Sequence, residues 1–237
     1  MNRPGNLVRC LGSIVGILAL ASLGGQLVKL FTGRPNLYGL IPLFNLDAES
    51  NLPTFYSSLL LLFAALLLAL IGVLKSRLKE PCALHWWILA LGFLYLAIDE
   101  AAKLHELMSR PTTTLLGGGT NGIFYRTWVL PAGALVILAG LFFLRFWLRL
   151  PGKTRFLFAL AAVTYVGAAA GLEVLAGHYA ERNGFDTLVY IGLATLEETL
   201  EMVAIVVFIH ALLQYIETQY GQIRLCLVPL PPQDRKV

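Results

Sequence analysis

The sequence has few of the residues that soluble proteins place on their surfaces. Only 14% of its 237 residues are charged, whereas soluble domains contain about a quarter. It has four histidines, too few for a haem-type or desaturase-type histidine cluster. Its three cysteines, Cys10, Cys82 and Cys226, stand alone, without the C-x-x-C spacing of a redox or zinc site. All three fall at the predicted cytoplasmic ends of spans, which also disfavours a disulfide.

Hydrophobic residues, in contrast, are abundant. They make up 57% of the chain, and its mean hydropathy is +0.73. A membrane-spanning helix needs about 20 mostly apolar residues. We therefore predict an all-α integral membrane protein: a six-transmembrane-helix bundle that forms one domain over residues 1–220, followed by a short cytoplasmic tail over 221–237. Runs of spanning length lie at roughly 8–31, 55–75, 84–108, 127–149, 155–180 and 187–216.

Lysine and arginine gather in alternate connections between these runs. The connection between the fourth and fifth runs contains four, Arg145, Arg149, Lys153 and Arg155, whereas the opposite loops contain fewer. The positive-inside rule therefore predicts that both termini are cytoplasmic, and we expect a bacterial inner membrane protein. The scattered basic residues predict contact with the lipid bilayer and no nucleic-acid partner.

The first run raises a question of processing. Ala19, Leu20 and Ala21 form an A-x-A sequence of the signal-peptidase kind, after Arg3 and Arg9. The apolar run continues to Phe31, however, which is long for a signal peptide, so we favour an uncut first helix. Either outcome leaves the later spans in the same orientation.

Half of the acidic residues lie inside the predicted spans. A charged side chain in the middle of a membrane costs at least ~2.5 kcal/mol, so function is the default interpretation. With a rise of 1.5 Å per residue, Asp99, Glu173 and Glu197 each lie roughly 12–15 Å from the external end of their helix. The third, fifth and sixth spans therefore bring acids to one depth. The seven are Asp99, Glu100, Glu106, Glu173, Glu197, Glu198 and Glu201.

Helical phase predicts how these acids are arranged. In the sixth span the three glutamates point to one side, so they must share one cavity. In the third span Asp99, Lys103 and Glu106 form one stripe, while His105 lies on another side unless the helix distorts. Several carboxylates in a low dielectric cannot all be ionised, so either some are protonated or a cation is bound among them. Lys103 is the only obvious internal cation.

Lys103 alone cannot balance the negative charge of these carboxylates, whereas one or two divalent metal ions would. Carboxylate oxygen and histidine nitrogen are ligands of iron, manganese and zinc. The spacings Glu100-x4-His105 and Glu173-x4-His178 differ from the soluble di-iron pattern Glu-x-x-His. As an alternative, Asp99, Glu100 and Lys103 form an ion-pair network that ties helices together. The candidate metal ligands are Asp99, Glu100, His105, Glu106, Glu173, His178, Glu197, Glu198 and Glu201, and the candidate catalytic residues are Glu197, Glu198, Glu201 and Lys103.

Three segments carry a resemblance to known proteins. DEAAKLHE (99–106), GLEVLAGHY (171–179) and LEETLEM (196–202) resemble the signature segments, DExxxxHE and EExxEM among them, of a family of uncharacterised bacterial multi-span membrane proteins. This resemblance covers about residues 84–217 and implies no activity. The pair Glu197-Glu198 is also similar to the EExxxR element of intramembrane CAAX-type proteases. Met202 occupies the arginine position, however, and the F-x-x-x-H companion is missing, since His210 follows Phe208 after one residue.

Three hypotheses follow for the function. The first is a metal-dependent enzyme that acts on a lipid or other apolar molecule from the external leaflet. The second is a transporter of protons or divalent cations, which needs access to both faces; confinement of the acids to the outer half favours the enzyme. The third is a membrane scaffold or assembly factor. The external loops are 32–54, which contains Pro35, Pro42 and Pro53, and 109–125. We expect 109–125 to be a flexible connector, although Gly117, Gly118 and Gly119 would also suit the hinge of a lid.

Overall fold

The computed structural model describes residues 4–104, 107, 114 and 128–221. Within these residues the regular structure is helical, without strands, and six helices are long and apolar enough to cross a membrane. The prediction of six apolar helices of membrane-spanning length is therefore confirmed, and these helices are typical of a multi-pass membrane protein. The spans are α1 (Pro4–Thr32), α3 (Leu52–Arg77), α4 (Ala83–Ala102), α6 (Val129–Leu148), a continuous helix made of α7 (Gly152–Val166), η3 (Gly167–Leu172) and α8 (Glu173–Asn183), and α9 (Leu188–Tyr220).

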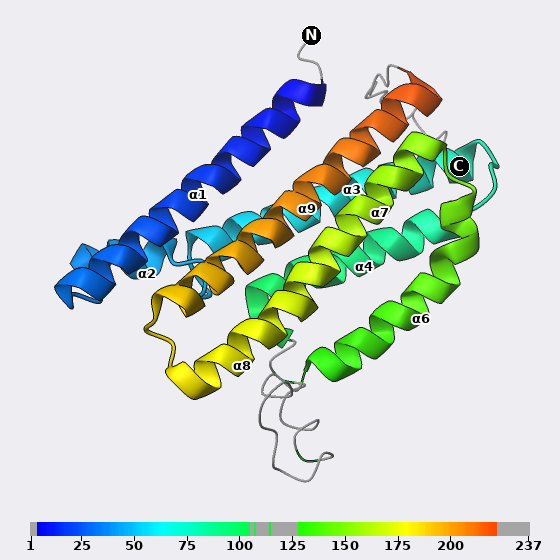
Figure 1. Ribbon diagram of the computed structural model, residues 1–237. Coiled ribbons are helices and arrows are strands. Elements are labelled where there is room, and N and C mark those ends of the chain that lie inside the picture. Colours follow the sequence, from blue (N-terminus) through cyan, green and yellow to red (C-terminus); the bar gives the residue numbers. More distant parts are fainter. Residues whose placement is uncertain (1–3, 105–106, 108–113, 115–127, 222–237) are drawn as a thin grey trace, which may run out of the picture.

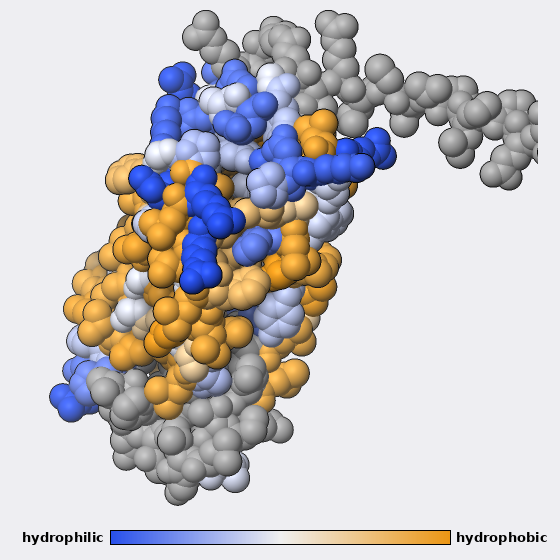
Figure 2. Space-filling model, turned by 90° about the vertical axis from the view of Figure 1, so that its right-hand side faces the viewer, coloured by the Kyte–Doolittle hydropathy of each residue, from blue (hydrophilic) through white to orange (hydrophobic). Residues whose placement is uncertain are grey.

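Consecutive spans run in opposite directions, so the described chain begins and ends on one side of the bundle (Figure 1). We call this side the terminal end and the other side the opposite end. Apolar side chains cover the middle of the molecule, while hydrophilic ones gather at the terminal end (Figure 2). An apolar middle and a polar end are the surface that a bilayer requires.

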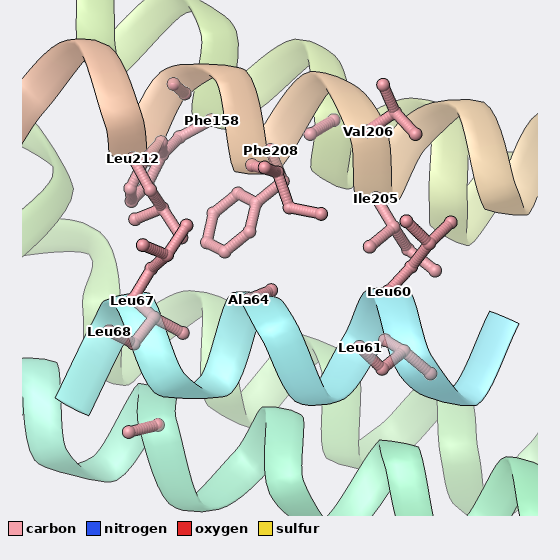
Figure 3. Close-up of a cluster of buried hydrophobic side chains, with 14 of the residues drawn as sticks. Leu60, Leu61, Ala64, Leu67, Leu68, Phe158, Ile205, Val206, Phe208 and Leu212 are labelled. Atoms are coloured by element: carbon pink, nitrogen blue, oxygen red, sulfur yellow. The ribbon is translucent and has the colours of Figure 1, made fainter. Parts of the chain in front are cut away.

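The packed core lies between α3 and α9, the two spans with the largest buried share. Leucines at helical spacing on α3 face Ile205, Phe208 and Leu212 of α9, and Phe158 of α7 closes the cluster (Figure 3). The spacing of three and four residues places these side chains on one face of each helix. Near the terminal end, the buried Trp86 of α4 packs with its ring centroid 4.9 Å from that of Tyr215.

Helices α3 and α4 pack closely because Gly72 has no side chain. A Cβ atom at this position would lie 3.1 Å from Cε2 of Trp87. We expect Gly72→Leu to push α4 away and to lower the free energy of unfolding by about 1–3 kcal/mol, as overpacking does. Gly92→Leu on α4 is the control, since nothing lies within 4 Å of that position. Unfolding in mixed micelles by titration with a denaturing detergent measures both; equal stability of the two variants would contradict the packing argument.

Helix α6 lies at the edge of the bundle (Figure 1) and contacts this core through Phe143, Phe146 and Trp147. Phe146 is the only buried residue in α6. Near the terminal end, the imidazole of His85 on α4 stacks on the rings of Phe142 and Phe146, with centroid distances of 5.5 and 5.2 Å. Toward the opposite end, the space between α6 and the other spans is a cavity.

The loop between α1 and α3 is folded. It contains η1 (Leu37–Gly39) and α2 (Leu40–Phe44). The side-chain amide of Asn51 donates to the carbonyls of Asn45 (2.6 Å) and Ala48 (2.8 Å), and its oxygen caps α3 at the Thr54 amide (3.2 Å). The other external loop, 109–125, lies outside the described residues apart from Thr114.

The predicted end of the third span is wrong. Helix α4 ends at Ala102, because Lys103 adopts a left-handed conformation with φ 56°. Its ammonium group forms an ion pair with Glu49 of the folded loop, at 2.7 Å. No glycine or proline marks this end, so the sequence contains no local signal for it. The fifth span, predicted to end at 180, continues to Asn183 and stops at Gly184, whose φ is 84°.

Candidate active site in the membrane region

A cavity of about 790 Å³ lies between α4, α6, the α7–η3–α8 helix and α9, beside the folded loop. Most of its lining side chains are apolar. No lysine, arginine or histidine is among the lining residues that the structure describes. The cavity is therefore strongly acidic as well as apolar. Its eight carboxyl side chains are Asp47, Glu49, Asp99, Glu100, Glu173, Glu197, Glu198 and Glu201.

Helix α9 contributes three of these acids from one turn. Its N-terminus is fixed by Thr187, whose hydroxyl accepts a hydrogen bond from the Tyr190 amide at 3.2 Å. The three glutamates follow two turns later on the side that faces the cavity. Glu197 is the most buried, with 6% of its surface exposed, and Glu198 and Glu201 are half-buried.

The fifth span positions Glu173 against α9. Its η3 segment is a π-helical turn, which shifts the phase of all residues that follow, and Glu173 is the first of them. Beyond it, Ala176 and Ala180 are buried against Tyr190 and Ala194 of α9. These small side chains allow the two helices to approach closely. As a result, the carboxyl groups of Glu173 and Glu197 lie side by side and interact directly.

Helix α4 supplies Asp99 and Glu100 from its last turn. Glu100 is close enough to Glu198 and Glu201 to interact electrostatically with both. The Tyr165 hydroxyl of α7 lies beside the Glu201 carboxyl group. Tyr165 also interacts electrostatically with Asp99, Glu100 and Glu198. We call these acids of three helices the carboxyl cluster: Asp99, Glu100, Glu173, Glu197, Glu198 and Glu201.

The other predicted site residues lie elsewhere. Lys103 pairs with Glu49 and is not among the described residues that line the cavity, so the predicted stripe does not continue past Ala102. His178 is half-buried one turn beyond Glu173, and it also does not line the described cavity wall. His105 and Glu106 lie outside the described residues.

The predicted metal site receives no support from this geometry. In the described part of the chain, no group of three or more histidine, cysteine, aspartate or glutamate side chains is arranged to hold a metal ion. The acids surround a cavity instead of converging on one point. Iron, manganese or zinc at this cluster stays a prediction.

Three cavity residues, Asp47, Glu49 and Tyr165, were not predicted from the sequence. Asp47 and Glu49 come from the loop, where acidic residues are common and give no signal. Tyr165 lies about two helical turns before Glu173, so helical periodicity indicates that the two share a face.

The Tyr190 hydroxyl donates to Asp47 at 2.8 Å and thereby fixes the loop to α9 at the cavity wall.

Removal of this hydroxyl tests how the loop is held. We expect Tyr190→Phe to loosen the loop and to lower the free energy of unfolding by about 1.5–3 kcal/mol, the range for a hydrogen bond to a charged group. Limited proteolysis between residues 33 and 51 should become faster. Tyr38→Phe in the same loop is the control, because that side chain is 99% exposed. Unchanged proteolysis of the Tyr190 variant would show that this hydrogen bond does not hold the loop.

The cavity has a polar part and an apolar part. Along α9 the glutamates lie toward the opposite end, whereas Ile205 and Phe208 line the cavity farther toward the terminal end. Along α4, which runs the other way, Leu89 and Phe93 precede the acids. Along the fifth span, the apolar residues of α7 also precede Glu173. On all three helices, therefore, the carboxyl groups lie toward the opposite end and hydrocarbon lines the rest.

No curated protein and no protein of solved structure matches this chain. A family model matches residues 12–216, a range that contains every acid of the cavity described above. The chain therefore belongs to the family described as Domain of unknown function (DUF8692).

Proposed function

We propose that the protein is a membrane enzyme that takes a lipid or similar amphiphilic molecule from the bilayer into this cavity and acts on its polar head at the carboxyl cluster. The observation that carries the proposal is the division of the cavity into an acidic part and a hydrocarbon part. Ligand cavities of this size, mostly apolar with a few polar groups at one place, are typical of small-molecule sites.

The pair Glu173–Glu197 supports chemistry in addition to binding. Two neighbouring carboxyl groups in a low dielectric repel each other when both are ionised, so such a pair is suited to sharing a proton. One group is then a general acid and the other a general base at the same place. Tyr165, beside Glu201, adds a hydroxyl that can donate a hydrogen bond to a substrate oxygen.

The proposal does not pass through a metal ion. A metal-dependent form of the enzyme would need ligands that the described residues do not bring together. His105 and Glu106 are the remaining candidates. Elemental analysis of the purified protein and of its Glu197→Gln variant tests this form separately: stoichiometric iron, manganese or zinc that is lost in the variant would establish it.

A second candidate is transport of the same molecule. The cavity follows α6 from Trp128 to Trp147, a distance of roughly 28 Å at 1.5 Å per residue, which is close to the thickness of the hydrocarbon layer. A carrier would move its cargo along this wall without changing it. Chemical change of the bound molecule distinguishes the enzyme from the carrier.

We further propose that the termini are cytoplasmic and that the carboxyl cluster faces the external leaflet of a bacterial inner membrane. Basic residues at the terminal end of the spans outnumber those at the opposite end, as the positive-inside rule requires. In intact cells, a membrane-impermeant thiol reagent should label a Phe185→Cys variant in the α8–α9 connection. It should not label Cys10 or Cys82. The reverse pattern would invert the topology.

Blocking the cavity tests the proposed function directly. Gly140 on α6 lines the cavity, and a Cβ atom there meets nothing within 4 Å. We expect Gly140→Trp to fill this space and to reduce co-purified lipid or amphiphile, measured by mass spectrometry of the extracted protein, at least about tenfold, equivalent to 1.4 kcal/mol. Leu141→Trp is the matched control, since Leu141 is 66% exposed and does not belong to the cavity wall.

The same extracts identify the bound molecule. Incubation of the wild-type protein with that molecule, followed by mass spectrometry, should reveal a product. Equal amounts of amphiphile on both tryptophan variants and on the wild type would overturn the proposal.

A further inference from the structure

The connection between α6 and α7 contains four basic residues and no acidic one: Arg145, Arg149, Lys153 and Arg155, which we call the basic turn. The first three are exposed, and Arg155 is half-buried. None of the four forms an ion pair with a carboxylate in the described part of the chain. We propose that the basic turn binds the head of an anionic phospholipid. This site does not depend on the proposed function.

Two guanidinium groups of the basic turn are held in place by uncharged partners. Arg155 donates to the Leu148 carbonyl at 3.3 Å and lies over the ring of Trp147, 5.9 Å from its centroid. The Trp147 indole donates to the Arg155 carbonyl at 2.9 Å. Arg149 donates to the sulfur of Cys82, at 3.8 Å, at the start of α4. A positive-inside signal needs only charge, whereas fixed guanidinium groups are the arrangement that recognises phosphate.

The other basic connection at the terminal end lacks this arrangement. Between α3 and α4, the ammonium group of Lys75 is engaged by Glu80. Arg77 and Lys79 are exposed beside it, and their side chains form no hydrogen bond or ion pair with other described residues. The two connections lie on the same side of the bundle, so they differ in anchoring and in acid content rather than in exposure to the membrane surface.

The surface next to the basic turn suits the chains of a phospholipid. Phe142 and Leu148 of α6 are 53% and 52% exposed, and Phe156 of α7 is 65% exposed. Hydrophilic surface at the terminal end borders directly on this kind of apolar surface (Figure 2). A phospholipid uses both parts, because its phosphate meets the guanidinium groups while its acyl chains lie along α6. A free phosphate ion would use only the first part.

A lipid bound here should strengthen the attachment of α6 to the bundle. Phe146 is the only buried residue of α6, so this helix has few internal contacts of its own. The head of the lipid would contact the α6–α7 connection beside Arg149, which already reaches Cys82 of α4. We therefore expect the anionic lipid to raise the thermal stability of the protein as well as to bind.

Competition between two phospholipids with the same dioleoyl chains tests the site. The full chain in neutral maltoside micelles receives equal amounts of phosphatidylglycerol, which is anionic, and phosphatidylcholine, which is zwitterionic. Native mass spectrometry then measures which lipid stays bound. We expect at least about a tenfold preference for phosphatidylglycerol, since each basic residue near an anionic lipid surface contributes roughly fivefold. Arg149→Gln combined with Lys153→Gln should remove most of this preference, and Lys153→Gln alone should remove part of it.

Arg77→Gln combined with Lys79→Gln is the matched control, because it removes the same charge from the other connection. It should keep the preference within about twofold of the wild type. Phosphatidylglycerol should raise the melting temperature of the wild type and of this control, but not that of the basic-turn variant. In micelles with phosphatidylcholine alone, all three should melt at similar temperatures, which shows that the variants are folded.

Three results would overturn the proposal. The first is equal retention of the two lipids by the wild type. The second is an equal loss of preference in both double variants, since the attraction would then come from the positive charge of the whole terminal end. The third is stabilisation by inorganic phosphate as large as that by phosphatidylglycerol, since the occupant would then be a free anion and not a lipid.

Discussion

Glu197→Gln is expected to make the ligand-free protein more stable and to abolish most of its function. Glu197 is almost completely buried beside Glu173, so the two carboxyl groups repel each other whenever both are ionised. The glutamine keeps the shape and removes the charge. The free energy of unfolding should rise by about 0.5–2 kcal/mol, as in other cases where a functional constraint is relieved.

Function should change in the other direction. Because the Glu173–Glu197 pair would no longer exchange a proton, turnover of the bound amphiphile should fall by about 10²–10⁴-fold, the usual contribution of general acid–base catalysis. Denaturant titration and mass-spectrometric product formation measure the two effects. Glu217→Gln should alter neither. A variant that is less stable than the wild type and retains full turnover would show that Glu197 is a structural residue.

Glu198→Lys should place a positive charge within the carboxyl cluster. The new ammonium group would be attached to the cavity wall, close to Glu100 and Glu201, which interact with position 198. It should remain charged because carboxylates surround it. We expect a higher free energy of unfolding for the ligand-free protein and a fall in turnover of the bound amphiphile of at least about tenfold, since the new side chain occupies part of the cavity beside the acids.

Two further variants separate this effect from general damage. Glu198→Met has a similar length without the charge, so it should gain less stability than the lysine variant. Glu217→Gln, at an exposed position on the same helix, is the control and should change neither stability nor turnover. Denaturant titration measures the stability of all three, and a lysine variant less stable than Glu198→Met would show that position 198 does not lie among ionised acids.

The six spans were predictable because the bilayer constrains their length and polarity. Every backbone group in hydrocarbon must form its hydrogen bond within the protein, so a long apolar run has few alternatives to a helix. The ends of the helices depend on weaker signals. Gly184 stops α8 as a glycine often does, whereas α4 stops at Lys103, beside an ion pair with a loop residue 54 positions earlier in the chain.

The acids on the spans were also predictable, since their cost in hydrocarbon makes them conspicuous in the sequence. Depth and helical phase indicated that α4, the fifth span and α9 contribute them. Asp47 and Glu49 were not predictable, because acids in loops are common and only the folded loop brings them to the cavity. The π-helical turn before Glu173 could not be predicted either, because nothing in the sequence GAAAGL distinguishes it from an ordinary α-helix.

The position of α6 at the edge of the bundle affects how the cavity can vary. Changes at Ala139 or Gly140, which line the cavity and are not among the residues packed against the core, would alter the width of its apolar part and leave the contacts between α3 and α9 intact. On the proposed function, tail preference would therefore evolve on one helix while the chemistry at the carboxyl cluster is retained on three others. Relatives with bulkier or smaller residues along this wall should select shorter or longer chains on an unchanged scaffold.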